Sequence, residues 1–360
     1  MTLSENTILN MIQNITIENF LNFKKFEAPR LAGINLLIGD NDTGKTGLLK
    51  LLYAVSKTWE IYSRRHSHGS PSFKKVLSEK IFDTFQPRSR NKIGEFVTKG
   101  TKQKLKVEVT YQTDKVHQSI SFQFGETTKK TINNCTDSVA LMGDNNVIFI
   151  PAKEVLTACR AIKFTREQHY LAGFDDTYLD LIRMLEVPTL DSAQIGQLNN
   201  INQQLEALLG GSIYQTDDDF LFKRGTQEFT MAMTAEGFKK IGILTTLIQN
   251  RQLNTGTILF LDEPETALHP RAIRHLSKVI VRLAALGVQV FLTTHNYFII
   301  KQLYICARQE NTSIFCFSLL NEQGFINTHF ADLKDSMPRN PIVDEALDMF
   351  DEDVAFDLGL

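Results

Sequence analysis

The sequence has few cysteines, the residues that cross-link small secreted domains, and it has no long apolar run. Only four of its 360 residues are cysteine, Cys135, Cys159, Cys306 and Cys316, and no two of them form a C-x-x-C pair. No Cys/His group has zinc-site spacing, which favours reduced thiols of a cytoplasmic protein. No stretch of about eighteen apolar residues predicts a membrane span, and the first residues lack the basic start of a signal peptide.

A large net charge is also missing, but the charge is unevenly distributed. Lys and Arg total 39 against 41 Asp and Glu, a net charge of −2, so any contact with nucleic acid needs a local basic patch. Basic residues dominate from Lys57 to Lys106, whereas every charged residue from Asp344 to Leu360 is acidic. His66 and His68 are a pair without a third ligand, which favours a surface loop over a metal site.

Apolar patterning predicts strands and helices in an α/β arrangement. Ile12, Ile15 and Ile17 alternate as in a strand, and the segments 104–113 and 117–125 resemble a β-meander. Four short apolar runs predict buried strands, and a helical pattern extends from about Thr165 to Leu209. The four runs are Asn35–Gly39, Val147–Ala152, Ile258–Leu261 and Val288–Thr294.

The most specific motif is GDNDTGKT, Gly39 to Thr46, which fits the phosphate-binding pattern G-x-x-x-x-G-K-[ST]. Its glycines let backbone N–H groups turn toward phosphates at the start of a helix. Lys45 is expected to reach the β- and γ-phosphates of ATP, and Thr46 to ligate Mg²⁺. A chance match is disfavoured because an apolar strand precedes the loop and an apolar helix follows it. The expected nucleotide-binding residues here are Gly39, Asn41, Asp42, Thr43, Gly44, Lys45, Thr46 and Gly47.

Two further polar groups follow predicted strands. Asp262 and Glu263 end the run TILFLDE, which places Asp262 to hold Mg²⁺ and Glu263 to act as the base on the attacking water. An acidic turn that caps a helix is the alternative. His295 ends QVFLTTHN and is expected to contact the γ-phosphate or the water, although a lone histidine is more often a core residue.

Together these motifs resemble the ABC-type ATPase superfamily, and in particular its RecF, SMC and overcoming-lysogenization-defect (OLD) branch. LDEPETALHP is similar to a joined Walker B and D-loop, and TTHN to an H-loop. The resemblance implies that Asn22, Phe23 and Lys24 lie near the base and phosphates. It also implies that the ABC signature is the divergent segment TAEGFKKIGIL, with Thr234, Glu236 and Gly237. The Q-loop has only Gln112 and Gln118 as candidates.

The resemblance also implies an assembly. In this superfamily the signature of one subunit covers the nucleotide held by another, so one set of motifs per chain implies an ATP-sandwich dimer or a higher oligomer. The D-loop residues Glu265, Thr266, Ala267 and His269 would cross that interface. ATP would then act as a switch, because it adds contacts only in the closed state.

The implied fold class is α/β: an ABC-ATPase head with a mixed core sheet, a β-meander subdomain and an inserted helical lobe. Residues 1–56 and 231–330 would form the nucleotide-binding core. Residues 57–230 would be the inserted lobe, and 331–360 an acidic tail.

Within this branch the sequence resembles stand-alone ATPase subunits of bacterial anti-phage systems such as Septu and PARIS. The segment between the motif sets lacks the heptads of SMC coiled coils. Glu345, Asp351 and Asp353 superficially imitate the metal-binding carboxylates of OLD nucleases, but no predicted strand frames them. The fold-level analogy implies an ATPase scaffold, without nuclease activity of its own, for a nuclease or toxin partner. The alternative is a RecF-like ATPase that clamps DNA, and a sensor that binds ATP without hydrolysing it is disfavoured by Glu263.

Two charged segments, one basic and one acidic, each allow more than one interpretation. The basic segment 57–106, with Phe73, Phe82, Phe85 and Phe96 interspersed, is either a solvated face or a DNA-contacting surface. In the acidic tail, four apolar residues approximate one helical stripe. We expect this stripe to pack on the protein's own core, with docking to a partner's basic groove and a free tail as alternatives. The four residues are Leu347, Phe350, Val354 and Phe356.

Overall fold

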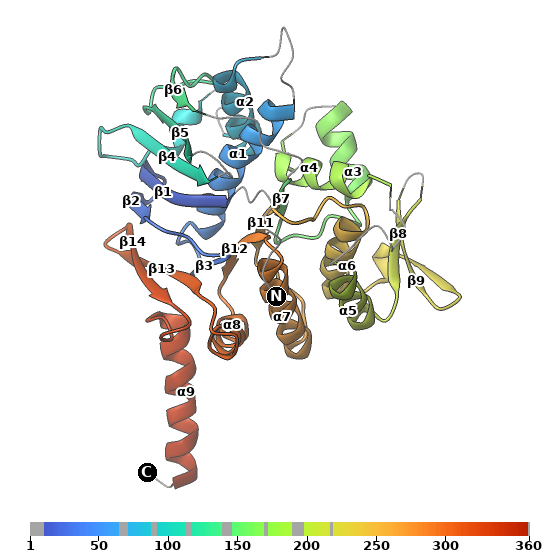
Figure 1. The fold of residues 1–360 in the computed structure, drawn as a ribbon. Coiled ribbons are helices and arrows are strands. Elements are labelled where there is room, and N and C mark those ends of the chain that lie inside the picture. The colour runs from blue at the N-terminus through green and yellow to red at the C-terminus, as the bar shows by residue number, and fades with distance from the viewer. Residues whose placement is uncertain are drawn as a thin grey trace.

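Three β-sheets and the surrounding helices form the part of the chain that the computed structural model describes (Figure 1). His66 and His68 lie outside that part, as does Arg65. None of the described helices is long and apolar enough to cross a bilayer. The described residues are 11–64, 71–87, 92–112, 117–138, 146–168, 172–188, 198–216 and 219–358.

The core sheet has the strand order β14-β13-β3-β12-β11-β7. Its strands are parallel except for β14, which pairs antiparallel with β13 at one edge. Every residue of the middle strands is buried, because both faces of the sheet are covered. The apolar runs seen in the sequence are therefore confirmed as buried strands. The strands are β3 (Ile34–Gly39), β7 (Val147–Ile150), β11 (Ile258–Asp262), β12 (Gln289–Thr294), β13 (Ile314–Glu322) and β14 (Phe325–Asp332).

Alternate side chains of the core sheet enter two hydrophobic clusters. Leu36 belongs to a cluster with helices α7 (Pro270–Ala285) and α8 (Tyr297–Gln309) on one face. Leu37, the next residue, belongs to a cluster with α1 (Lys45–Arg64) on the other face. Each such fully buried side chain stabilises the fold by about 1.5–3 kcal/mol. This two-sided burial fixes the carboxyl ends of the strands, where the candidate site lies.

An antiparallel sheet of order β2-β1-β4-β5-β6 shares the α1 cluster. The predicted meander is present as β4 and β5. The helix α2 (Phe73–Phe85) packs on α1 within the segment that the sequence marked only as basic. The strands of this sheet are β1 (Met11–Phe20), β2 (Phe23–Ala28), β4 (Leu105–Gln112), β5 (His117–Phe124) and β6 (Asn134–Asp137).

A helical lobe and a small antiparallel sheet, ordered β10-β9-β8, lie beside the core sheet (Figure 1). The long helical pattern of the sequence forms separate helices in the structure. Asp175 caps the start of α4 by accepting a hydrogen bond from the N–H of Thr177. Gly210, in the left-handed conformation, ends α5. The elements are α3 (Cys159–Lys163), α4 (Asp176–Leu185), α5 (Asn199–Leu209), β8 (Ser212–Gln215), β9 (Phe220–Arg224), β10 (Gln227–Thr230) and α6 (Glu236–Gln249).

Sheet membership crosses the domain boundaries expected from the sequence. β7 lies within 57–230, yet it is the edge strand of the core sheet beside β11. β1 and β2 lie within 1–56, yet they belong to the antiparallel sheet with β4. Strand pairing therefore joins segments that these boundaries assign to different domains.

The basic segment is not a uniform surface. Lys57 and Lys80 are buried, and Phe73 and Phe96 are core residues. Phe85 packs against Phe96 with ring centroids 4.8 Å apart. These aromatic rings are therefore not free to stack on bases, and the DNA-contact interpretation loses that support.

The acidic tail forms α9 (Pro341–Leu358), which projects from the body (Figure 1). Its start is anchored, since Val343 is 4% exposed, but Leu347 is 51% and Phe350 63% exposed. The expectation that the apolar stripe packs on the protein's own core is therefore wrong beyond the first turn. Amphipathic spacing predicts the stripe but does not say what covers it.

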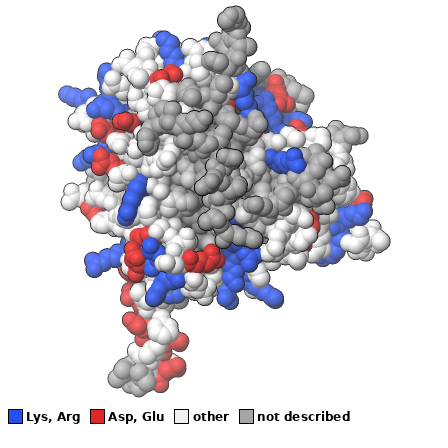
Figure 2. All heavy atoms as spheres, viewed as in Figure 1, with Lys and Arg blue, Asp and Glu red and all other residues white. Residues whose placement is uncertain are grey.

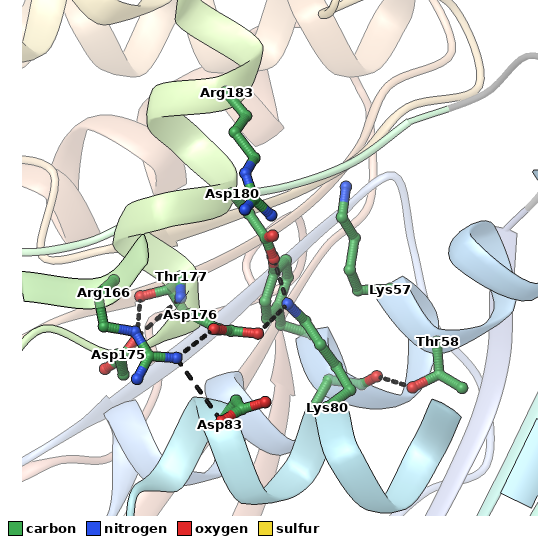
Figure 3. Close-up of polar contacts among 12 residues, drawn as sticks. Lys57, Thr58, Lys80, Asp83, Arg166, Asp175, Asp176, Thr177, Asp180 and Arg183 are labelled. Atoms are coloured by element: carbon green, nitrogen blue, oxygen red, sulfur yellow. Dashed lines mark hydrogen bonds and ion pairs between the residues drawn. The ribbon is translucent and has the colours of Figure 1, made fainter. Parts of the chain in front are cut away.

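A buried ion-pair network joins α2 to α4 beside α1 (Figure 3). Lys80 lies 2.9 Å from Asp176 and also pairs with Asp180, and Arg166 lies 2.6 Å from Asp176. Tyr53 of α1 donates its hydroxyl to Asp180. Burial lowers the pKa of Lys80, but Asp180 and Asp176 outweigh it, so the net shift is upward. The network ties the helix after the GDNDTGKT loop to the helical lobe.

Replacing Lys80 by methionine should lower the free energy of unfolding by about 3–5 kcal/mol, because the mostly buried Asp180 loses its ion-pair partner and Asp176 keeps only Arg166. Denaturant unfolding measures this loss. Lys75→Met, an exposed lysine on the same helix, is the control and should change stability by less than about 0.5 kcal/mol. Equal losses in the two variants would contradict the account.

The same network sets an acid limit on stability. Although burial raises the pKa of Asp180, the charges of Lys80 and Lys57 lower it further, so the folded pKa lies below the unfolded one. The contribution of Asp180 to stability is therefore present above about pH 3.9 and is lost as the pH falls through the lowered pKa.

Candidate functional site

Three loops leave the carboxyl ends of neighbouring core strands. β3, β12 and β11 lie side by side, with Ile38 opposite Thr294 and Thr293 opposite Asp262. In open parallel sheets, ligands bind at this edge. The structure thus brings together the GDNDTGKT loop, the Asp262–Glu263 pair and His295, as the sequence predicted.

The loop between β3 and α1 depends on glycine. Gly44 has φ +78°, and an added Cβ would lie 2.8 Å from the ring of Phe23. Lys45 turns back over the loop, and its Nζ donates to the carbonyl oxygens of Gly39 and Asp40, each at 2.7 Å. Burial lowers the pKa of Lys45, against the opposing effect of Glu263 and other carboxylates. Within the part of the chain that the structure describes, the hydrogen-bond partners of this buried cation are neutral carbonyls, which it can exchange for an anion.

The other predicted residues of the loop differ in exposure. Asn41 and Asp42 are exposed, and Asp42 has φ +64°. Thr43 is buried and donates its hydroxyl to the carbonyl of Asp40 at 2.8 Å. Gly47 packs under Leu21, where an added Cβ would lie 2.9 Å from the side chain. Thr43 and Gly47 therefore shape the loop, whereas Asn41 and Asp42 face solvent.

Thr46 and Asp262 form an oxygen pair across two strand ends. The Thr46 hydroxyl donates to Asp262 Oδ1 at 2.8 Å, and the Thr293 hydroxyl donates to the same atom at 2.7 Å. Burial raises the pKa of Asp262, and these hydrogen bonds oppose the rise. A hydroxyl beside a carboxylate fits the oxygen preference of Mg²⁺. The described residues contain no cluster of three or more His, Cys, Asp or Glu side chains for a metal, so phosphates and water would complete the shell.

Glu263 sits in a fixed, strained position next to His295. Its Oε1 lies 3.0 Å from Nδ1 of His295, and both side chains are partly exposed. The backbone of Glu263 has φ +44°, an uncommon conformation that is typical of functional sites. Its N–H is held by Thr293 and its carbonyl by the ammonium of Lys240 at 2.8 Å. A carboxylate so oriented can accept a proton from a water molecule.

The D-loop residues do not all face outward as expected. Glu265 is only 5% exposed, accepts a hydrogen bond from Thr294, and has a pKa raised by burial. Its side chain therefore does not project toward another subunit, because Thr294 holds it inside its own chain. Thr266 and Ala267 are exposed, and Ala267 has φ +64°. His269 is exposed and caps α7, its Nδ1 accepting from the N–H of Arg271.

The divergent signature lies at the start of α6, against the D-loop. The carboxylate of Glu236 pairs with Lys239 at 2.8 Å, so its negative charge is balanced within its own helix. Thr234 precedes the helix and donates to the carbonyl of Thr230. Gly237 is buried against the D-loop: an added Cβ would lie 2.6 Å from Leu268 and 2.8 Å from the carbonyl oxygen of Ala267.

Gly237→Ala should lower the free energy of unfolding by about 1–3 kcal/mol, because the added methyl overpacks the contact between α6 and the D-loop. Thermal unfolding measures the loss. Gly33→Ala is the matched control, since its nearest atom is at an ordinary 3.5 Å. If the Gly237→Ala and Gly33→Ala variants are equally stable, α6 does not pack against the D-loop as closely as described.

The early aromatic and basic element lies behind the loop. Phe23 is fully buried and supports Gly44 from within, so its ring cannot stack on a base. Lys24 lies 3.6 Å above the ring of Phe325, and Asn22 is exposed. Phe23 therefore lies beside the phosphate-binding loop, where its ring packs under Gly44 and is not open to solvent.

The sequence motifs did not predict the roles of several residues at the site. Lys240 holds the Glu263 carbonyl, yet it gave no signal within an apolar helical pattern. Thr293 and Thr294 were part of the TTHN motif, and their hydroxyls could have been considered as partners of the neighbouring carboxylates. The Q-loop candidates Gln112 and Gln118 lie in the antiparallel sheet instead. The segment that starts at Pro151, after β7, lies next to the end of β11 and leads into the helical lobe.

Two family models match the chain. One, described as an AAA ATPase domain, covers residues 11–183. The other, described as "AAA domain, putative AbiEii toxin, Type IV TA system", covers residues 163–301. An ATP/GTP phosphatase of Helicobacter pylori is 22% identical over 89% of this chain and 96% of that protein. The Old nuclease of Escherichia phage P2 is 22% identical over 79% of this chain and 56% of the nuclease, so this chain spans about half of that protein.

Solved structures share the fold. An SMC head bound to the C-winged helix domain of ScpA aligns with a TM-score of 0.52 and 12% identity, over 90% of this chain and 98% of that one. An SMC head with an extended coiled coil, bound to the C-terminal domain of ScpA and derived from Pyrococcus furiosus, gives 0.51 and 10%, over 96% and 99%. The fold is thus that of an SMC head, and the family models and relatives support an ATPase similar to those of the OLD and SMC branch.

Proposed function

We propose that the site binds Mg²⁺·ATP and hydrolyses it to ADP and phosphate. The observation that carries the proposal is the pairing of Thr46 with Asp262 beside the pairing of Glu263 with His295, at one edge of the sheet. Lys45 would exchange its two carbonyl partners for phosphate oxygens. Mg²⁺, held by Thr46 and Asp262, would supply charge neutralisation on the phosphates.

Glu263 is proposed as the general base. Its carboxylate would take a proton from water as that water attacks the γ-phosphorus. His295 would hold the carboxylate in place through the 3.0 Å contact and would hydrogen-bond the γ-phosphate with its other ring nitrogen. Phosphate release from ATP by the purified protein tests this, and release no faster than from Lys45→Ala protein would refute it.

A second copy is proposed to complete the site. The start of α6 would cover the nucleotide of a partner subunit. Thr234 is partly exposed there, and Gly237 lies beside the D-loop. Exposed Thr266 and Ala267 would cross the interface. This arrangement would make ATP the switch between an open and a closed dimer.

The biological role is proposed to be that of a regulatory scaffold in anti-phage defence, with a nuclease or toxin as its effector and no nuclease activity of its own. The match to the AbiEii-type model and to a phage nuclease supports a setting of phage conflict. The projecting α9 supports a role in assembly. The competing role is a DNA clamp, for which the exposed lysines Lys74, Lys75, Lys99 and Lys102 remain available.

One experiment separates these roles. Tagged Glu263→Gln protein is purified from its native host with ATP present, with and without DNase, and its partners are identified by mass spectrometry. A stoichiometric nuclease or toxin after DNase treatment supports the scaffold. Recovery of the protein alone, with DNA present when DNase is omitted, supports the clamp. Steep weakening of that DNA binding by salt would confirm phosphate contacts.

A further inference from the structure

α9 carries an apolar stripe that its own chain leaves uncovered. The helix has 18 residues and is about 27 Å long. At about 3.6 residues per turn, Val343, Leu347, Phe350 and Val354 follow one another along one side, whereas Phe356, a residue of the stripe expected from the sequence, lies on the opposite side. Only Val343 is buried, and Phe350 remains 63% exposed. A stripe with this spacing is typical of a helix that docks into a groove.

The rest of α9 is strongly acidic. The helix carries seven Asp and Glu side chains and no Lys or Arg. None of these carboxylates forms an ion pair with any residue that the structure describes. On the helical wheel Asp351 and Asp357 flank the apolar stripe, whereas Glu345 and Glu352 lie opposite it. A surface that covers the stripe would therefore meet acidic side chains along its margins.

A basic groove lies between α7 and α8. Its volume is about 500 Å³, and no Asp or Glu occurs in the sequence from Thr266 to Gln309. Phe298, which is 51% exposed, offers an apolar contact in the groove. Figure 2 shows Lys and Arg side chains at the lower rim of the body, where Figure 1 places these helices. The groove is lined by Pro270, Arg271, Arg274, His275, Lys278 and Phe298.

The cations of this groove also lack carboxylate partners within the described chain. Arg271, Arg274 and Lys278 form no ion pair there, and Arg274 donates only to the amide oxygen of Gln302, at 3.2 Å. The molecule thus carries an unpaired acidic helix and an unpaired basic groove, each with exposed apolar side chains at its centre.

We propose that α9 of one copy docks in the α7–α8 groove of a second copy of this chain. The helix points away from its own body, so its stripe is presented to another molecule (Figure 1). The complementary charges favour that pairing and set its orientation. Because each copy has one helix and one groove, two copies exchange helices and close a two-fold dimer. This contact is separate from the proposed ATP sandwich and does not need nucleotide.

Sedimentation equilibrium of nucleotide-free protein in EDTA tests the proposal. The wild type should self-associate reversibly, and added salt should weaken the association. Asp351→Arg/Asp357→Arg and Arg271→Glu/Lys278→Glu should each weaken it by about tenfold or more. A mixture of these two variants should associate again, because each reversed helix then meets a reversed groove and each native helix a native groove.

A matched control and an apolar variant sharpen the result. Glu345→Arg/Glu352→Arg makes the same charge change on the opposite side of α9 and should weaken association less than about threefold. Phe350→Ala should weaken it about tenfold by removing an apolar anchor. Circular dichroism and thermal unfolding verify that every variant is folded.

Three outcomes would overturn the proposal. The first is a wild type that stays monomeric at all concentrations. The second is equal weakening by both α9 double variants, without recovery in the mixture. In the third, the groove variant keeps its self-association but loses binding to a duplex oligonucleotide, which would assign the groove to nucleic acid.

Discussion

Glu263→Gln protein should bind ATP but hydrolyse it about 100 to 10,000 times more slowly than the wild type, the usual contribution of a general base. In the wild type, Nδ1 of His295 lies 3.0 Å from the Glu263 carboxylate. Glutamine keeps the size of the side chain, and its amide can still form a hydrogen bond with His295. It cannot accept a proton from water. Steady-state phosphate release and ATP binding by calorimetry measure the two effects separately.

The control for Glu263→Gln is Glu108→Gln, the same change at an exposed glutamate on β4. Glu108 lies on the antiparallel sheet, outside the proposed nucleotide site. Its loss should change hydrolysis much less. Hydrolysis by Glu263→Gln protein at the wild-type rate would show that the assignment of the base is wrong.

Lys45→Ala protein should lose detectable ATP binding, because the phosphates lose their principal cation. The change removes a side chain that the folded protein already holds in the loop, where it donates to the carbonyls of Gly39 and Asp40. Its buried ammonium has a lowered pKa, so removal of the charge should not destabilise the fold strongly. Fluorescent-nucleotide titration measures binding, and thermal unfolding measures stability.

The matched control for this change is Lys99→Ala, an exposed lysine outside the loop. It should bind ATP with wild-type affinity. If Lys45→Ala protein binds ATP as tightly as Lys99→Ala protein, the loop does not hold the phosphates.

The core of the fold was predictable because its signals are local. Buried parallel strands read as unbroken apolar runs, and Gly44, Lys45 and Asp262 follow such runs directly. The carboxyl ends of parallel strands meet at one edge of a sheet, so the sequence alone predicts that these residues lie close together.

What the sequence missed depends on contacts between distant segments. Phe23 is buried because it fills the space above Gly44, and Glu265 turns inward because Thr294 binds it. Lys80 is internal because its partners, Asp176 and Asp180, lie on another helix about a hundred residues away. A run of lysines in the sequence cannot distinguish such internal pairs from a solvated surface.

The position of α9 has the same origin. Its spacing predicts an amphipathic helix, and its exposed stripe appears only once the body is folded and Phe350 is left outside. The sequence could propose a basic groove as the partner, and the structure adds a groove of that charge between α7 and α8.

The most direct test of the account is sedimentation velocity of Glu263→Gln protein that also carries Asp351→Arg/Asp357→Arg to suppress the proposed helix exchange. We predict a monomer without nucleotide or with ADP, and a stable dimer with Mg²⁺ and ATP, because unhydrolysed ATP would hold two copies together. A monomer under all three conditions would contradict the composite ATP site.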